Sequence, residues 1–266
     1  MARSASPLPQ GSPRSAPRKS RWLSPWMDVW AIAAWGILFL TYWANGRLYL
    51  LIHPNYMPLT VIAGIALIAL AIWRAISILR QRKARSGGSS ESHITLLPTG
   101  WSSALLLATA IAGFIITPRA FASQTALQRG VQDAPTLTRV RPQAFRTSSN
   151  PEDKSIIDWV RTLTAYPEPD AYNGQRAKVE GFVIHPDDLP PDYLLISRFV
   201  LTCCAADAYP ISLPVKLAGA RDQYKQDTWL EIKGTMTSET LNGKRMLVIQ
   251  AETLSPIPEP KNPYDY

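Results

Sequence analysis

The chain has 266 residues and carries 28 Lys and Arg against 20 Asp and Glu, which gives a formal net charge of +8. Residues 1–150 carry 16 basic and 3 acidic side chains, whereas residues 151–266 carry 12 and 17. The basic half contains long apolar runs, and the other half is acidic. This division argues against nucleic-acid binding, which concentrates positive charge on a folded surface. Two cysteines are too few for a disulfide framework.

Three apolar stretches in the first half predict a helical membrane region over residues 26–116. We expect spans at about 27–45, 57–79 and 98–117, because a hydrocarbon core of about 30 Å needs about 20 helical residues. Most of the nine Trp residues lie in the first 101 positions. They fall near the predicted span ends, where amphipathic aromatic rings prefer to sit.

The charges of the connecting segments predict an orientation. The tail 1–25, whose composition is typical of disorder, carries five basic residues, and the loop 80–93 carries four. The segment between the first two spans carries only Arg47. Because positive loops stay in the cytoplasm, we expect a multi-pass protein of the bacterial inner membrane with a cytoplasmic N-terminus. Three spans then place the chain after Thr117 outside the cytoplasm.

The second half is predicted to contain a linker at 117–150, a β domain at 151–255 and an extended tail at 256–266. Asn150, Pro151 and the two acids after them combine an N-cap, a first-turn proline and first-turn carboxylates, which predicts one leading helix.

Alternating apolar positions predict the strands of the β domain. They lie at Arg176–Ile184, Tyr193–Thr202, Ile211–Val215, Thr228–Thr237 and Lys244–Leu254, with a hairpin turn at Asn242-Gly243. Because closure removes exposed edges, five short strands favour a small all-β domain of the OB-like barrel type. A small open sandwich is the alternative.

Several segments of this half resemble one known family. They are Val179–Val183, Ser197–Ala208, Asp227–Leu230, Gly234 and Asn262–Tyr266, and the string R-F-x-x-x-C-C-x-A-D within them is the specific one. The chain resembles bacterial subunits of a two-component membrane permease complex that have a C-terminal extracytoplasmic domain of unknown function. The resemblance implies a separate polytopic permease as partner. It also marks Gly181, Arg198, Phe199 and Trp229 as structural or family-motif positions.

The adjacent cysteines leave three hypotheses open. In the first, Cys203, Cys204 and Asp207 bind a Zn or Cu ion, with His185 as a fourth ligand. This hypothesis requires the strand to end there, because neighbouring strand residues point to opposite faces. In the second, the two cysteines form a strained, easily reduced disulfide. In the third, both are buried small hydrophobic residues, and Arg198 and Asp207 form a structural ion pair.

No nucleotide-binding loop, zinc-protease helix motif or Ser/His/Asp set is visible in the sequence, which favours a protein that is not an enzyme. His53 and His93 are expected to be solvated loop residues. Three spans with few intramembrane charges make a poor transporter alone. We therefore expect a non-catalytic accessory subunit of a permease complex, whose extracytoplasmic domain contacts the permease or its cargo, a metal ion included. A membrane-anchored thiol-redox or metal-binding module is the alternative.

Overall fold

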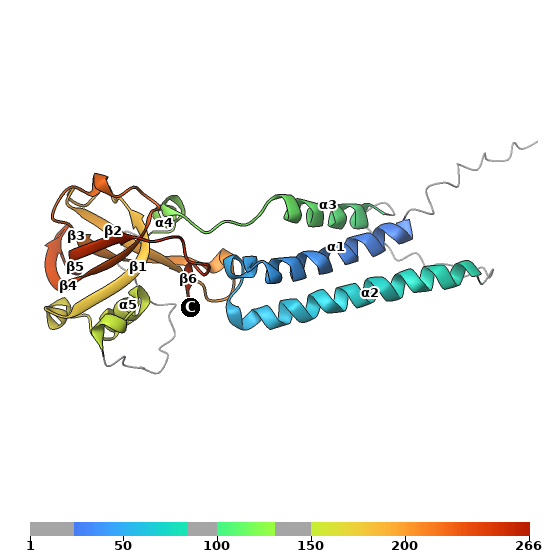
Figure 1. Cartoon of the computed structure of the whole chain (residues 1–266), viewed down its shortest axis with the longest axis horizontal. Coiled ribbons are helices and arrows are strands. Elements are labelled where there is room, and N and C mark those ends of the chain that lie inside the picture. Colours follow the sequence, from blue (N-terminus) through green and yellow to red (C-terminus); the bar gives the residue numbers. More distant parts are fainter. Residues whose placement is uncertain (1–23, 84–99, 131–149) are drawn as a thin grey trace, which may run out of the picture. The chain divides into compact units, whose positions relative to one another are not determined.

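The computed structural model describes residues 24–83, 100–130 and 150–266, and it divides into two compact units (Figure 1). The helical unit contains the described residues of Met1–Leu40 together with Val61–Ile116. The β unit contains Thr41–Thr60 together with the described residues of Thr117–Tyr266. The connection between the first two helices therefore belongs to the same unit as the C-terminal half.

Three helices make up most of the helical unit: α1 (Ser24–Ala44), α2 (Met57–Lys83) and α3 (Trp101–Ile115). A glycine pair brings α1 close to α2, because a Cβ atom at Gly36 would lie only 2.9 Å from the carbonyl oxygen of Gly64. Small residues allow helix backbones to approach in this way.

The helices α1 and α3 lie side by side and run in the same direction. Near their N-terminal ends, the Ser103 hydroxyl donates a hydrogen bond to Asp28. Near their C-terminal ends, a Cβ atom at Gly113 would lie 2.8 Å from Leu38 Cδ2. Between these points the indole of Trp35 donates to a backbone carbonyl of α3 over 3.0 Å.

Two helices of the described chain are long and apolar enough to cross a membrane, over Pro25–Ala44 and Pro54–Arg80. The predicted third span is the shorter α3, whose 15 residues extend about 22 Å at 1.5 Å per residue. The prediction of three helices of spanning length is therefore wrong for the third. Gly100 has a left-handed φ of 92° and starts this helix late, and the chain becomes extended at Ile116.

The β unit is built on a six-stranded mixed sheet with the order β1-β4-β5-β3-β2-β6. Its strands are β1 (Arg176–Ile184), β2 (Tyr193–Val200), β3 (Tyr209–Lys216), β4 (Trp229–Leu241), β5 (Lys244–Pro256) and β6 (Tyr264–Asp265). Strand β1 also pairs with β2, so that β1, β4, β5, β3 and β2 form a closed ring of paired strands. The hairpin between β4 and β5 turns at Asn242 and Gly243, which have positive φ angles of 50° and 74°, as such turns require.

Short helices complete the unit. They are the α-helices α4 (Ser123–Gln128) and α5 (Ile156–Ala165) and the 3-10 helices η2 (Arg47–Leu50), η3 (Pro54–Tyr56), η4 (Pro151–Asp153), η5 (Pro169–Tyr172), η6 (Ala205–Asp207) and η7 (Arg221–Gln223). The predicted leading helix exists, but it starts at Ile156 after a capping box of Ser155 and Asp158. Asn150 instead caps the 3-10 turn before it.

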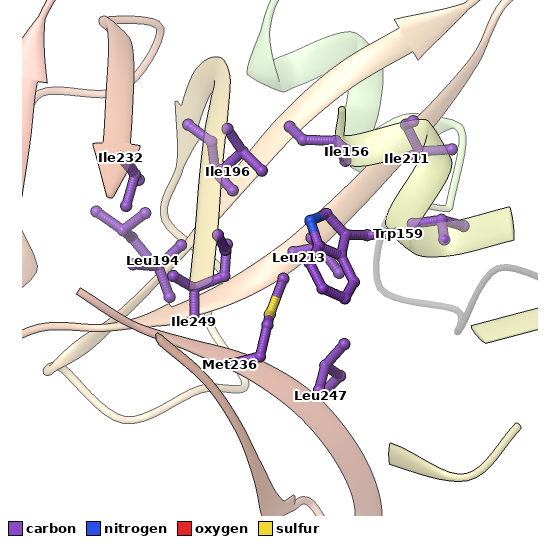
Figure 2. Packing of buried hydrophobic residues seen from close by; sticks show 14 of the residues in the cluster. Ile156, Trp159, Leu194, Ile196, Ile211, Leu213, Ile232, Met236, Leu247 and Ile249 are labelled. Atoms are coloured by element: carbon purple, nitrogen blue, oxygen red, sulfur yellow. The ribbon is translucent and has the colours of Figure 1, made fainter. Parts of the chain in front are cut away.

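The interior of the ring is covered by α5. Trp159 of α5 is completely buried and lies with Leu213 and Met236 in one apolar cluster that includes residues of β1 to β5 (Figure 2). The amphipathic spacing of Ile156, Trp159 and Val160 buries this face of the helix. The well-packed sheet therefore supports the loops at the ends of its strands.

Part of the predicted linker packs on this unit. Ala126 of α4 is completely buried, and Phe121 lies 5.2 Å from the ring of Phe199. The rest of that linker, residues 131–149, lies outside the described residues. The predicted tail up to residue 23 and the loop from 84 to 93, with His93, do so as well.

Candidate functional site

The two cysteines lie in a sharp turn between β2 and β3, which we call the thiol turn (residues 202–207). The carboxylate of Asp207 organises this turn: it accepts the backbone N–H of Cys203 at 2.9 Å and that of Cys204 at 3.1 Å, together with the Thr202 hydroxyl. Because β2 ends at Val200, the cysteines are free of the strand alternation. Their sulfur atoms lie 3.6 Å apart.

The thiol turn is the one group of potential metal ligands found in the described ranges. One ligand atom each of Cys203, Cys204 and Asp207 lies within 4.8 Å of the others. Both cysteines are free thiols; Cys203 is exposed and Cys204 is half-buried. The structure brings these three residues together, and the binding of an ion by them stays a prediction.

The electrostatics of the turn favour the protonated thiol. The hydrogen bond to Asp207, followed by the one to Cys204, raises the pKa of Cys203 to about 11. For Asp207 itself burial raises the pKa, but the hydrogen bonds from Thr202, Cys203 and the backbone outweigh it and lower the pKa overall. A reactive thiol needs a lowered pKa, so the free turn is a weak nucleophile.

Two expected partners of this turn lie elsewhere. His185 follows the end of β1, and its Nε2 lies 2.7 Å from the carbonyl oxygen of Tyr224, so it does not join the ligand group. Arg198 forms its ion pair with Asp265 at 3.3 Å instead of with Asp207. The pairing with Asp265 depends on β6, because this strand lies beside β2 in parallel register.

A segment that the sequence did not connect with the cysteines lies beside them. Ile52, between α1 and α2, forms an antiparallel bridge with Cys204. Two backbone hydrogen bonds flank the bridge, from His53 N to Cys203 O at 3.0 Å and from Ala205 N to Leu51 O at 2.8 Å. No local sequence pattern predicts this contact, because the two segments are far apart in the sequence.

The family-motif residues form the apolar base below the turn. Phe199 is completely buried and stacks on Phe182, with ring centroids 5.7 Å apart. Trp229 lies in the same cluster, and the Arg198 guanidinium lies 5.6 Å from its ring. Gly181 permits the close approach of β1 and β2, since a Cβ atom there would lie 2.5 Å from the carbonyl oxygen of Ser197. Phe199 and Trp229 thus contribute to the packing of the β unit, and the role of the four residues as family-motif positions stays a prediction.

The arrangement as a whole defines a class of protein: an apolar helical unit joined to a β unit that displays a pair of free thiols at one end of its sheet. Residues 27–132 match the DUF1980 N-terminal domain, and residues 147–266 match the DUF1980 C-terminal domain. The chain therefore belongs to the DUF1980 family.

One relative is the UPF0703 protein YcgQ of Bacillus subtilis (strain 168), with 26% identity over 129 residues. The match covers 47% of this chain and 45% of the relative, so the chain spans less than half of that protein's length.

Proposed function

We propose that this chain is a membrane-anchored, non-catalytic accessory subunit of a transport complex. Its helices would hold the β unit at the outer surface of a bacterial inner membrane, where that unit meets a polytopic permease or its cargo. The observation that carries the proposal is the apolar outer surface of α2 and α3. Leu59, Ile62, Trp73, Leu105 and Ile115 are all more than half exposed, which suits a lipid or protein surrounding and not water.

The few charged residues of the helices favour an accessory role for this chain. They argue against a transport path through the chain itself. In α1, α3 and residues 57–80 of α2, the charged residues are Asp28, Arg74 and Arg80. Asp28 is bonded to Ser103, and Arg80 lies at the end of the candidate span Pro54–Arg80. Because ion and substrate pathways in membranes are marked by ionisable residues in the bundle interior, we assign conduction to a partner.

Chain connectivity supports a topology with three crossings. Residues 41–60 and 117–266 belong to one unit, so they would lie on the same side of a membrane if α1 and α2 cross it. The chain leaves α2 on the opposite side and must return before Thr117. The parallel contacts of α3 with α1 favour α3 as the returning segment in this proposal. Its short length would be accommodated by local thinning of the bilayer.

The ring of paired strands supports the proposal that the β unit is a small OB-like barrel. In barrels of this type, a loop-rich end and one sheet face bind extended ligands. The thiol turn lies at the end of β2 in this ring. A contact with the permease or with its cargo would therefore be made by loops on a rigid support.

The experiment that tests the accessory role is purification of the tagged full chain from its native membrane in a mild detergent. A stoichiometric polytopic partner is expected, and recovery of the chain alone would overturn the proposal. Labelling of single cysteines tests the topology: with a Cys203→Ser/Cys204→Ser background, a cysteine placed at exposed Glu168 should react with an impermeant maleimide in intact spheroplasts. Reaction only after lysis would overturn the orientation.

The thiol turn favours a second candidate function, capture of a thiophilic metal ion. Two sulfur atoms 3.6 Å apart on one turn can bind the same ion, and soft thiolates select Cu(I) or Zn²⁺. The raised pKa of Cys203 lowers the amount of thiolate, which both metal binding and disulfide exchange require, so metal binding and disulfide exchange are compared by experiment. Equal Zn²⁺ and Cu(I) affinity of the parent and the Cys203→Ser/Cys204→Ser variant would remove this candidate.

A further inference from the structure

We infer that Arg129 is a positioning residue of the thiol turn, and that it couples capture of an ion by Cys203 and Cys204 to the anchoring of residues 118–130 on the β unit. This inference rests on the second proposed function, metal capture by the thiol turn. It gives a role to the described part of the predicted linker, which follows α3 along the chain.

The side chain of Arg129 binds the backbone of the thiol turn and of the residue after it. Arg129 directly follows α4. Its Nη1 donates hydrogen bonds to the carbonyl oxygen of Ala208 and, over 3.4 Å, to that of Ala205. Carbonyl groups at the ends of helical turns lack partners within the turn, and a cationic donor suits them. The two bonds lie on either side of Asp207, so the guanidinium holds the chain around the carboxylate that orders both cysteine N–H groups.

The segment that carries Arg129 is itself fixed to the β unit. The guanidinium lies 4.8 Å from the centroid of the Phe121 ring, a cation–π contact. The backbone N–H of Phe121 donates to the Tyr264 hydroxyl at 3.2 Å. The backbone N–H of Ser123 donates to the Asp227 carboxylate at 2.6 Å. Because these bonds hold the segment in place, they also hold the guanidinium beside the thiol turn.

The segment between α1 and α2 holds the backbone of the same turn. The N–H of Ala205 donates to Leu51 O at 2.8 Å, while the carbonyl of Ala205 accepts from Arg129. The N–H of His53 donates to Cys203 O at 3.0 Å. None of these bonds uses a sulfur atom. The backbone of the turn is therefore ordered before an ion binds, which lowers the entropic cost of bringing two thiols to one ion.

The effect of these contacts is reciprocal. An ion bound by both sulfur atoms, which lie 3.6 Å apart, would restrict the backbone of the turn and with it the carbonyl groups that Arg129 binds. Coupling between two sites is symmetric in free energy. If the contact of Arg129 raises the affinity for the ion, the ion strengthens that contact by the same factor. Ion capture would thus strengthen the anchoring of the chain that follows α3.

The test uses the full chain, purified in detergent and reduced, and titrated with Zn²⁺ or anaerobically with Cu(I) against a chromophoric chelator. The main variant is Arg129→Gln, which removes the cation, and Arg129→Lys keeps it. Arg221→Gln is the matched control, because Arg221 also donates to a loop carbonyl of the β unit, that of Pro186 at 2.6 Å. Circular dichroism and thermal melting of each variant check that the fold is retained.

The parent should bind one ion, and Arg129→Gln should bind it about tenfold more weakly, the lower end of the loss seen when partners of metal ligands are removed. Arg129→Lys should recover part of the affinity, because its ammonium group can still donate to a carbonyl. Arg221→Gln should lower the melting temperature and leave the affinity unchanged. Equal affinity of Arg129→Gln and the parent, or an equal loss of affinity in Arg129→Gln and Arg221→Gln, would overturn the positioning role.

A second measurement tests the coupling on the parent chain. Hydrogen exchange followed by mass spectrometry should show stronger protection of residues 119–129 when Zn²⁺ is bound, and no change at residues 186–192. The Cys203→Ser/Cys204→Ser variant should show no effect of Zn²⁺ on either segment. Unchanged exchange of residues 119–129 in a parent that binds the ion would overturn the coupling and leave metal capture intact. A parent that binds no ion would overturn metal capture, and this inference with it.

Discussion

The two units of this protein bury opposite kinds of side chain. The buried apolar residues of the helical unit are small or medium in size: Val29, Ala31, Leu38, Ala71 and Ala110. Several of its largest side chains are exposed: Trp30 and Trp73 are each 63% exposed, and Trp101 is 66% exposed. In the β unit several large side chains form the core, with Trp159, Phe199 and Tyr264 all at 2% exposure or less.

This contrast indicates which force stabilises each unit. In the β unit, removal of large apolar surface from water drives folding. In the helical unit, the helix backbones approach each other at small residues such as Gly36 and Gly64. Many large side chains are exposed on the outer surface of this unit. That pattern is typical of helices packed in lipid, where tails are as apolar as leucine and close packing drives association.

The largest expected effect on stability compares two tryptophans, one fully buried in the β unit and one exposed in the helical unit. Trp159→Ala removes a fully buried ring and should lower the free energy of unfolding of the β unit by about 3–5 kcal/mol. Trp73→Ala, on the exposed surface of α2, should leave that value unchanged. Urea unfolding of the detergent-solubilised chain, followed by near-UV circular dichroism, measures both. A comparable loss in the two variants would contradict the division into units.

The next effect concerns the chemistry of the thiol turn. Asp207→Asn removes the main cause of the raised pKa of Cys203, so this pKa should fall from about 11 toward the ordinary value of 9.0. The thiolate fraction at pH 8 would then rise by up to roughly a hundredfold, since each pKa unit changes it tenfold. Iodoacetamide alkylation of the Cys203 peptide, measured by mass spectrometry between pH 7 and 11, follows the change. Parallel pH profiles of parent and variant would refute the role of Asp207.

A smaller effect tests the close approach of β1 and β2. Gly181→Ala would place a Cβ atom 2.5 Å from the Ser197 carbonyl oxygen, so the strands must move apart. Overpacking of this kind costs about 1–3 kcal/mol. Gly219→Ala is the control, because its new Cβ would meet only the flexible end of the Gln223 side chain at 3.0 Å. Equal melting temperatures for the two variants would mean that the strands yield freely.

The elements that the sequence predicted well are those with a local signal. The strand β1 has the predicted bounds, and the Asn242-Gly243 hairpin has the predicted turn. The strand β6 was missed because two residues of a Pro-rich tail pair with β2 only through tertiary contact. The leading helix was placed too early because Asn150 and Ser155 both have capping side chains, and only the latter caps an α-helix.

In the candidate site, too, local features could be predicted from the sequence and long-range contacts could not. Cys203, Cys204 and Asp207 lie within five residues, so their proximity could be inferred from a single turn. The backbone contact of this turn with the segment around Ile52 could not be inferred, because it depends on which distant segment pairs with the turn. The sequence suggested His185 as a fourth ligand, but its ring lies against the carbonyl oxygen of Tyr224. The orientation of the chain in a membrane and the identity of its partners depend on molecules outside the chain, so both stay predictions.

The smallest effect separates surface charge from core packing in the β unit. Glu239 of β4 accepts a hydrogen bond from Lys216 Nζ at 2.8 Å and one from the hydroxyl of Tyr193. The hydrogen bond from Lys216, followed by the one from Tyr193, lowers the pKa of this carboxyl. Because the pKa is lower in the folded state than the ordinary value of 4.5, the pair stabilises the fold above about pH 4.5 and loses this contribution as the pH falls through the folded pKa.

Glu239→Gln should therefore lower the free energy of unfolding at pH 7 by no more than about 1 kcal/mol, as for other partly exposed pairs. The difference from the parent should shrink once the pH falls below the folded pKa, where the parent carboxyl is also neutral. Glu168→Gln, at an exposed turn, should differ little from the parent at either pH. A Glu239→Gln loss that matches Trp159→Ala, or one that persists unchanged in acid, would show that this corner of the sheet depends on the shape of the side chain and not on its charge.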